Sequence, residues 1–163
     1  MSSPWISELS RFVATVRQTQ LELISVQEQK VVVLRDLDEA ALEQLSQREG
    51  ELVQTLQALL AVRQRILEQA RQTGRAAETL GQLILQFSPE ERGDLPARLA
   101  ETERVAEKLR QVTWTHWVMA QRCYQHAGEL LDFMAEGGHQ APVYERTAAR
   151  TQDAGAIILD ASA

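Results

Sequence analysis

The chain has 163 residues, of which 44% are hydrophobic and 25% are charged, with four prolines and eight glycines. This composition is typical of one soluble helical domain and not of a disordered protein. The net charge of -6 provides no basic surface for nucleic acid, and a single cysteine excludes an intramolecular disulfide. The sequence shows neither an apolar run long enough for membrane insertion nor a signal peptide, so we expect a cytoplasmic protein.

The N-terminal third of the chain predicts one helix and the start of a second. Ser2 or Ser3 is expected to cap the first helix, with Pro4 in its first turn, and apolar residues follow in steps of three and four. This helix is expected to run to about residue 33. Asp36 and Glu39 have the spacing of a capping box, which predicts that the second helix starts at Asp36.

The second helix has a seam of residues in alternating steps of four and three, and Gly74 is expected to end it. Two members of this seam, Glu49 and Arg63, are charged. Because a buried unpaired charge costs several kcal/mol, we expect the seam to border solvent along part of its length. The seam consists of Leu45, Glu49, Leu52, Leu56, Leu59, Arg63, Ile66 and Ala70.

Residues 78–87 predict a short helix, and a loop or single turn follows it. Ser88 and Pro89 have the pattern of a helix cap with proline at the first position, while Gly93 and Pro96 limit the length of this turn. The short helix carries Leu80, Leu83, Ile84 and Phe87 on one face.

A long helix of about 40 residues, roughly 60 Å in length, is predicted from Leu95 onward. Its seam alternates steps of four and three as far as Met134, through Thr113, His116, Cys123 and Leu130 among others. One flanking line holds Trp117, Tyr124 and Leu131, with Trp114 beside it, and the line on the other side ends at Phe133. Such a face is wider than a two-stranded seam requires. Either the helix packs between two other helices, or part of this apolar face is free to bind a partner protein.

We therefore expect an all-α fold, an elongated antiparallel helical bundle or coiled coil of three to four helices, in a domain formed by residues 1–136. Residues 137–163 have no usable periodicity and are expected to form a flexible C-terminal tail. Within this tail, Pro142 favours an extended backbone at Ala141, close to Tyr144. The side chain of Tyr144 either packs against the helical bundle or is recognised by a partner protein.

His116, Cys123 and His126 are the one cluster that resembles a metal site, because imidazole and thiolate are zinc ligands. One helix rarely supplies a complete tetrahedral site, and the simpler interpretation is that His116 and Cys123 are members of the seam. The sequence has no Glu-x-x-His pair, phosphate loop or hydrolase motif. We expect no enzymatic activity, no catalytic residue, no metal and no cofactor.

The order of these segments resembles the FlgN-type flagellar export chaperones. The resemblance lies in DLDEAALEQLSQREGELVQTLQALLAVRQRIL (residues 36–67), in GRAAETLGQLI (residues 74–84), and in a long last helix followed by the tail sequence APVYERT. It implies a cytoplasmic protein that binds the hook-filament junction proteins FlgK and FlgL and delivers them to the type III export gate or its ATPase complex.

By the same resemblance, the substrate protein would contact the late part of the long helix, and the export gate would contact Val143 and Tyr144. The implied substrate-binding residues are Trp117, Tyr124, Leu130, Leu131, Phe133 and Met134. Two alternatives remain open. The wide face is a homo-oligomer interface of a self-associating coiled-coil adaptor, or the histidines and the cysteine bind a metal or haem.

Overall fold

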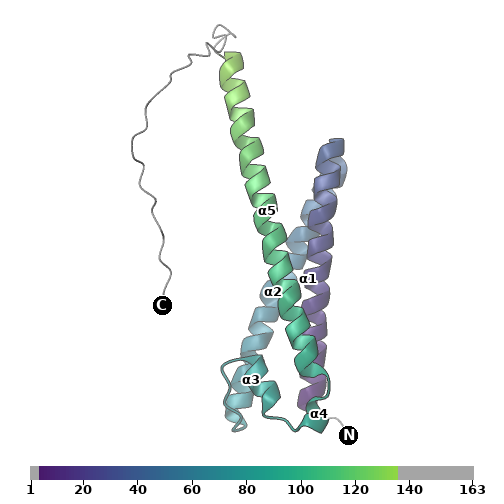
Figure 1. Ribbon diagram of the computed structural model, residues 1–163, viewed down its shortest axis with the longest axis vertical. Coiled ribbons are helices and arrows are strands. Elements are labelled where there is room, and N and C mark those ends of the chain that lie inside the picture. The colour runs from purple at the N-terminus through teal and green to yellow at the C-terminus, as the bar shows by residue number, and fades with distance from the viewer. Residues whose placement is uncertain (1–3, 136–163) are drawn as a thin grey trace, which may run out of the picture. The chain divides into compact units, whose positions relative to one another are not determined.

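The computed structural model describes residues 4–135, and five helices occupy nearly all of this range. Within these residues no strand occurs, which confirms the predicted all-α class. The expected tail, with Val143 and Tyr144, lies outside the described residues. The helices are α1 (Pro4–Asp36), α2 (Glu39–Gln72), α3 (Leu80–Leu85), α4 (Pro89–Arg92) and α5 (Leu95–Ala135) (Figure 1).

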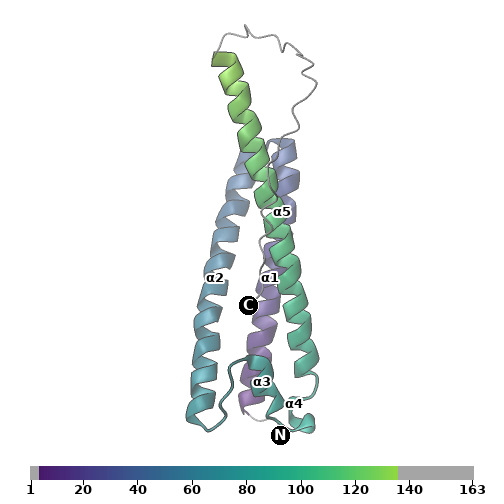
Figure 2. The same ribbon diagram turned by 60° about the vertical axis from the view of Figure 1, so that its left-hand side comes forward.

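The chain divides into two compact units, one ending at Arg122 and one starting at Cys123. In the first unit residues of α1, α2 and the early part of α5, shown in Figure 2, pack together in two hydrophobic clusters. The polar contacts between α1 and α5 advance together along both helices, which makes the two helices parallel, whereas α2 is antiparallel to α1. These contacts join Ser10 to Arg98, Arg17 to Glu101, and Gln27 to Thr113.

The main hydrophobic core of the first unit lies where α3 covers the start of α1 and the end of α2. All four apolar residues predicted to share one face of the short helix are buried here, as are the last two residues of the α2 seam, Ile66 and Ala70. A smaller core farther along joins Leu23 and Val26 of α1 to Leu52 of α2. The buried members of the main core are Ile6, Leu9, Val13, Ile66, Ala70, Leu80, Leu83, Ile84, Phe87 and Leu95.

The turn between α1 and α2 differs from the prediction. Asp36 is the last residue of α1, and Asp38 is the N-cap of α2, where its side chain accepts a hydrogen bond from the Ala41 N–H (3.0 Å). Leu37 lies between them with a left-handed φ of 56°. The Leu37 N–H donates to the Leu34 carbonyl and the Asp38 N–H to the Val33 carbonyl, a pair of bonds that commonly ends a helix. The prediction of a helix start at Asp36 was therefore wrong.

α1 ends at Asp36 and not at about residue 33, and α3 is shorter than the predicted 78–87. The expected cap at Ser2 or Ser3 lies outside the described residues.

Two other predicted ends are confirmed. Gly74, with φ of 80°, follows the C-cap of α2, and Ser88 forms a capping box with Glu91 that starts the single turn of α4. Thr79 caps α3 by accepting a hydrogen bond from the Gln82 N–H (3.2 Å). α5 has 41 residues, close to the predicted length.

Candidate functional site

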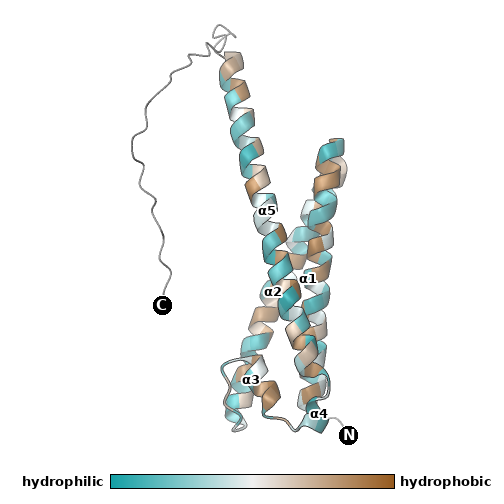
Figure 3. Cartoon of the chain, in the orientation of Figure 1, coloured by the Kyte–Doolittle hydropathy of each residue, from teal (hydrophilic) through white to brown (hydrophobic). Residues whose placement is uncertain are grey.

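The late part of α5 presents large apolar side chains to solvent. The six residues implied to bind a substrate protein all lie in this helix, and between 50% and 79% of the surface of each is exposed. Large apolar residues at such exposure, close together on one helix, indicate a surface for protein binding more than a packed core. These six are Trp117, Tyr124, Leu130, Leu131, Phe133 and Met134. In Figure 3, hydrophobic and hydrophilic residues alternate along α5 as far as its last turns.

Helical geometry places the apolar residues of the second unit around about half of the helix circumference. At about 100° per residue, Leu130 and Met134 lie on the seam, Tyr124 and Leu131 lie on one flank, and Phe133 lies on the opposite flank. A partner that covered all of these side chains would therefore have to contact both flanks of this stretch of α5. We call Tyr124, Leu130, Leu131, Phe133 and Met134 the α5 apolar arc.

Two tryptophans form an exposed aromatic pair in the first unit. The rings of Trp114 and Trp117 stack with centroids 5.1 Å apart and an interplanar angle of 24°. Both side chains are more than half exposed. Aromatic side chains dominate the binding energy of many protein interfaces, and this pair is already ordered by its own stacking. The pair therefore adds a rigid apolar contact on the same helix.

A polar layer crosses the three long helices of the first unit. The buried Gln27 of α1 donates from Nε2 to Glu49 of α2 (3.3 Å) and to Thr113 of α5 (3.1 Å), and Lys30 contacts Glu49 (2.7 Å). Burial raises the pKa of Glu49, but hydrogen bonds from Lys30 and Gln27 and the charges of Lys30 and His116 outweigh it, so the pKa is lowered. Glu49 thus occupies its seam position as a half-buried, paired carboxylate.

The residues of the suggested metal cluster have other surroundings. His116 is half-buried and lies close enough to the polar layer for its charge to affect Glu49, while Cys123 is exposed. His126 Nδ1 lies 3.7 Å from a carboxylate oxygen of Glu129, one turn along the same helix. Within residues 4–135, no group of three or more His, Cys, Asp or Glu side chains is placed to hold a metal ion.

The structure also contains a groove that the sequence reasoning missed. A cavity of about 620 Å³ lies among α1, α2, α3 and α5 in the first unit. Its α2 wall includes Val53 and Leu60, which are 40% and 60% exposed and belong to none of the predicted seams. The signal was present, because Val53, Leu60 and Leu67 repeat every seven residues beside the α2 seam.

Comparison with protein-family models, with curated proteins and with solved structures gives no match to this chain. Among the helices of residues 4–135, none combines the length and apolar character that crossing a membrane requires. What the chain does must therefore be argued from its own residues, and among these the α5 apolar arc is the most prominent exposed feature.

Proposed function

We propose that this protein is a cytoplasmic export chaperone that binds hook-filament junction proteins of the FlgK and FlgL type and delivers them to the flagellar type III export gate. Two observations support the proposal. Residues 36–67 and 74–84 resemble the FlgN-type chaperones in order and spacing. The α5 apolar arc supplies what such a chaperone needs, because it leaves large apolar side chains free to contact an export substrate.

The α5 apolar arc is the observation that carries the proposal. An export substrate that is not fully folded exposes amphipathic segments, and the gain from covering them is about 25 cal/mol for each Å² of apolar surface removed from water. Two substrate helices that pack on opposite sides of α5 would cover both flanks, one helix contacting Leu131 and the other contacting Phe133. This binding requires no nucleotide and no chemical step.

The tail has a separate role in the proposal. By the resemblance, Val143 and Tyr144 contact the export gate after the substrate has bound to α5. Because the substrate contacts α5 and the gate contacts the tail, both can bind at the same time.

Binding of the isolated C-terminal segments of FlgK and FlgL, measured by isothermal titration calorimetry, tests the proposal. Leu131→Glu and Phe133→Glu alter opposite flanks of the arc, and each is expected to weaken binding by about ten- to a hundredfold, as the burial energy of one large apolar side chain predicts. Gln125→Glu is the matched control, because it changes the polar face of the same helix and should leave the affinity within about twofold.

Two results would contradict the proposal. If neither segment binds at micromolar concentration, the export role is lost. If light scattering shows a tight dimer that Leu131→Glu dissociates, and flagellar segments have no effect on it, the arc is the interface of a self-associating adaptor instead.

A further inference from the structure

The stretch of α5 from residue 103 to residue 122 belongs to the first unit but contains no buried residue. We call it the α5 middle stretch. The two buried residues of α5, Leu95 and Thr102, both lie at its start, whereas α1 has buried residues from Ile6 to Gln27. Because burial of apolar surface supplies most of the attraction between helices, the middle stretch is held more weakly than the start of α5.

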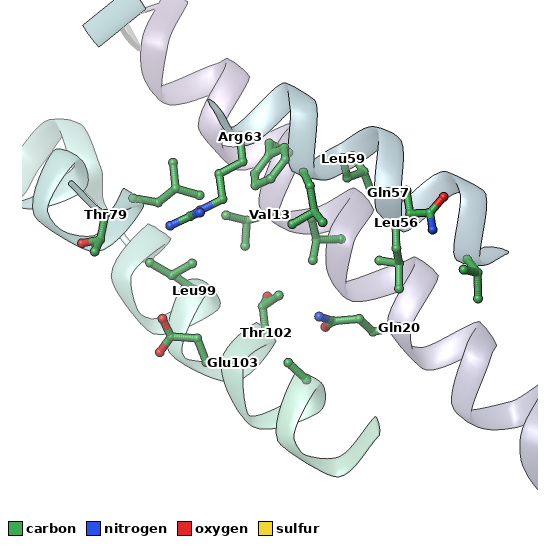
Figure 4. A pocket seen from close by; sticks show the side chains of 17 residues that line it. Val13, Gln20, Leu56, Gln57, Leu59, Arg63, Thr79, Leu99, Thr102 and Glu103 are labelled. Carbon is green, nitrogen blue, oxygen red and sulfur yellow. The ribbon is translucent and has the colours of Figure 1, made fainter. Parts of the chain in front are cut away.

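Apolar packing of α5 against α2 is incomplete where the middle stretch begins. Thr102 and Glu103 of α5 border the cavity of about 620 Å³, and Leu56 and Leu59 of α2 lie on its other side (Figure 4). Side chains that border a cavity lose the dispersion contacts that a packed neighbour would provide. Farther along, Leu109 is the one residue of the middle stretch that belongs to either hydrophobic core.

The polar layer joins the middle stretch to a buried side chain. Gln27 is 5% exposed, and its Nε2 donates to Thr113 Oγ1 (3.1 Å) and to Glu49 Oε1 (3.3 Å). The Thr113 hydroxyl in turn donates to Gln27 Oε1 (3.2 Å). A second polar contact, between Lys108 and Glu28, spans 3.8 Å, and its side chains are 61% and 60% exposed. An ion pair so exposed contributes little.

The amide of Gln27 makes the polar layer sensitive to loss of a single group. A buried polar atom that loses its partner costs the desolvation of that atom, whereas replacement of both partners by apolar groups is nearly neutral. If the middle stretch moves away, water reaches Gln27 and satisfies its amide. Removal of the Thr113 hydroxyl therefore penalises the closed arrangement and not the open one.

We propose that the polar layer is a latch that holds the α5 middle stretch closed on α1 and α2. When the latch opens, the middle stretch leaves these helices as a unit, while Leu95 stays in the main core. Opening uncovers the smaller core, whose members Leu23, Val26 and Leu52 are 3%, 8% and 5% exposed in the closed arrangement. The protein thus has a concealed apolar surface whose exposure the latch controls. The proposal does not rest on the export function, because no latch residue belongs to the α5 apolar arc.

Amide hydrogen exchange of the full-length protein, followed by NMR, measures opening residue by residue. After correction for intrinsic rates, the amides of residues 109–116 should exchange at least tenfold faster than those of Leu9 and Val13. The reason is that Leu9 and Val13 lie in the main core, which opening of the latch leaves intact.

Two threonines of α5 provide matched variants. The Thr113 hydroxyl bonds to Gln27 of α1, whereas the Thr115 hydroxyl donates to the Gln111 carbonyl of its own helix (2.9 Å). Thr113→Val should speed exchange of residues 109–116 about tenfold, and Thr115→Val less than twofold. In Gln27→Leu, which removes the buried amide, Thr113→Val should change this exchange less than twofold. Circular dichroism confirms that each variant folds.

Labelling of an introduced thiol tests whether opening uncovers the smaller core. Cys123 is exposed, so the background is Cys123→Ser. Val26 and Val13 lie on α1 in the smaller and the main core, at 8% and 2% exposure. Val26→Cys should react with a disulfide reagent at least tenfold faster than Val13→Cys, and adding Thr113→Val should speed the reaction of Val26→Cys about tenfold.

Four results would overturn the proposal. If residues 109–116 exchange no faster than the main core, α5 opens only when the whole protein unfolds. Equal effects of Thr113→Val and Thr115→Val would show that the bond to Gln27 does not hold the middle stretch. An undiminished effect of Thr113→Val in Gln27→Leu would mean that Thr113 acts through another contact. Equal labelling of Val26→Cys and Val13→Cys would show that opening does not uncover the smaller core.

Discussion

Leu83 and Leu85 lie two residues apart on the six-residue helix α3, yet their surroundings are opposite. Leu83 is fully buried in the main core, whereas Leu85 is 63% exposed. Mutation of each to alanine therefore removes the same atoms from the same short helix with very different consequences. The comparison tests whether α3 docks on α1 and α2 in the described orientation.

The cost of Leu83→Ala has two parts. Removal of three buried carbon atoms costs about 2.4 kcal/mol at roughly 0.8 kcal/mol each. The residual cavity, on the order of 50 Å³ after partial collapse, adds about 1.2 kcal/mol at roughly 24 cal/mol per Å³. We expect a loss of about 3.5 kcal/mol in the free energy of unfolding. For Leu85→Ala, where little surface is buried, the expected change is within about 0.5 kcal/mol.

Urea unfolding followed by far-ultraviolet circular dichroism measures both changes. Tryptophan fluorescence in a variant with Trp114 and Trp117 replaced by phenylalanine gives a local second signal, because the remaining Trp5 packs against the main core. A loss below about 1 kcal/mol for Leu83→Ala, or equal losses for the two variants, would refute the described docking of α3. A loss at Leu83 alone, with coincident transitions by both signals, is the expected result.

Three further predictions concern the polar layer and the α1–α2 turn. The folded-state pKa of Glu49 is lowered from 4.5, so ionised Glu49 stabilises the fold fully above pH 4.5. This stabilisation is lost as the pH falls through the lower folded-state pKa. Glu49→Gln should reduce this loss of stability in acid, as measured by urea unfolding at several pH values. Asp38→Ala should cost about 1 kcal/mol in thermal unfolding by loss of the N-cap, whereas Asp36→Ala should cost almost nothing. Leu37→Gly should raise the stability by up to about 1 kcal/mol, because glycine adopts the left-handed backbone without strain; an unchanged or lower melting temperature would contradict this.

The sequence predicted the helices well because their ends carry recognisable chemistry. Gly74 and Ser88 each satisfy backbone groups in a way that residue type alone reveals. The α1–α2 turn lacks such a signal, since a leucine occupies the position where glycine is usual. The spacing of Asp36 and Glu39 predicted a cap at Asp36, and only the backbone conformation shows that Asp38 caps the helix.

The candidate site was predicted in part. Periodicity identified the apolar residues of late α5, because a face of three adjacent lines is visible in the sequence. Periodicity identifies the residues that share one face of a helix, but it does not show which faces pack against another helix. The repeat of Val53, Leu60 and Leu67 was visible beside the α2 seam, but only the structure shows that Val53 and Leu60 stay partly exposed at the cavity.

The seam of α5 changes in character at the polar layer, and this change bears on how a partner would bind. Before Thr113 the seam contains Leu99 and Leu109, which pack against the other helices. Beyond His116 its next members are Ala120, Cys123 and Ala127, which are small and exposed. Small residues let another helix approach closely but bury little apolar area themselves. Along residues 120–127 the binding energy must then come from flank side chains such as Tyr124, so mutation of Tyr124 should outweigh mutation of Ala120 or Cys123. Leu130 and Met134 return large exposed side chains to the seam in the last turns.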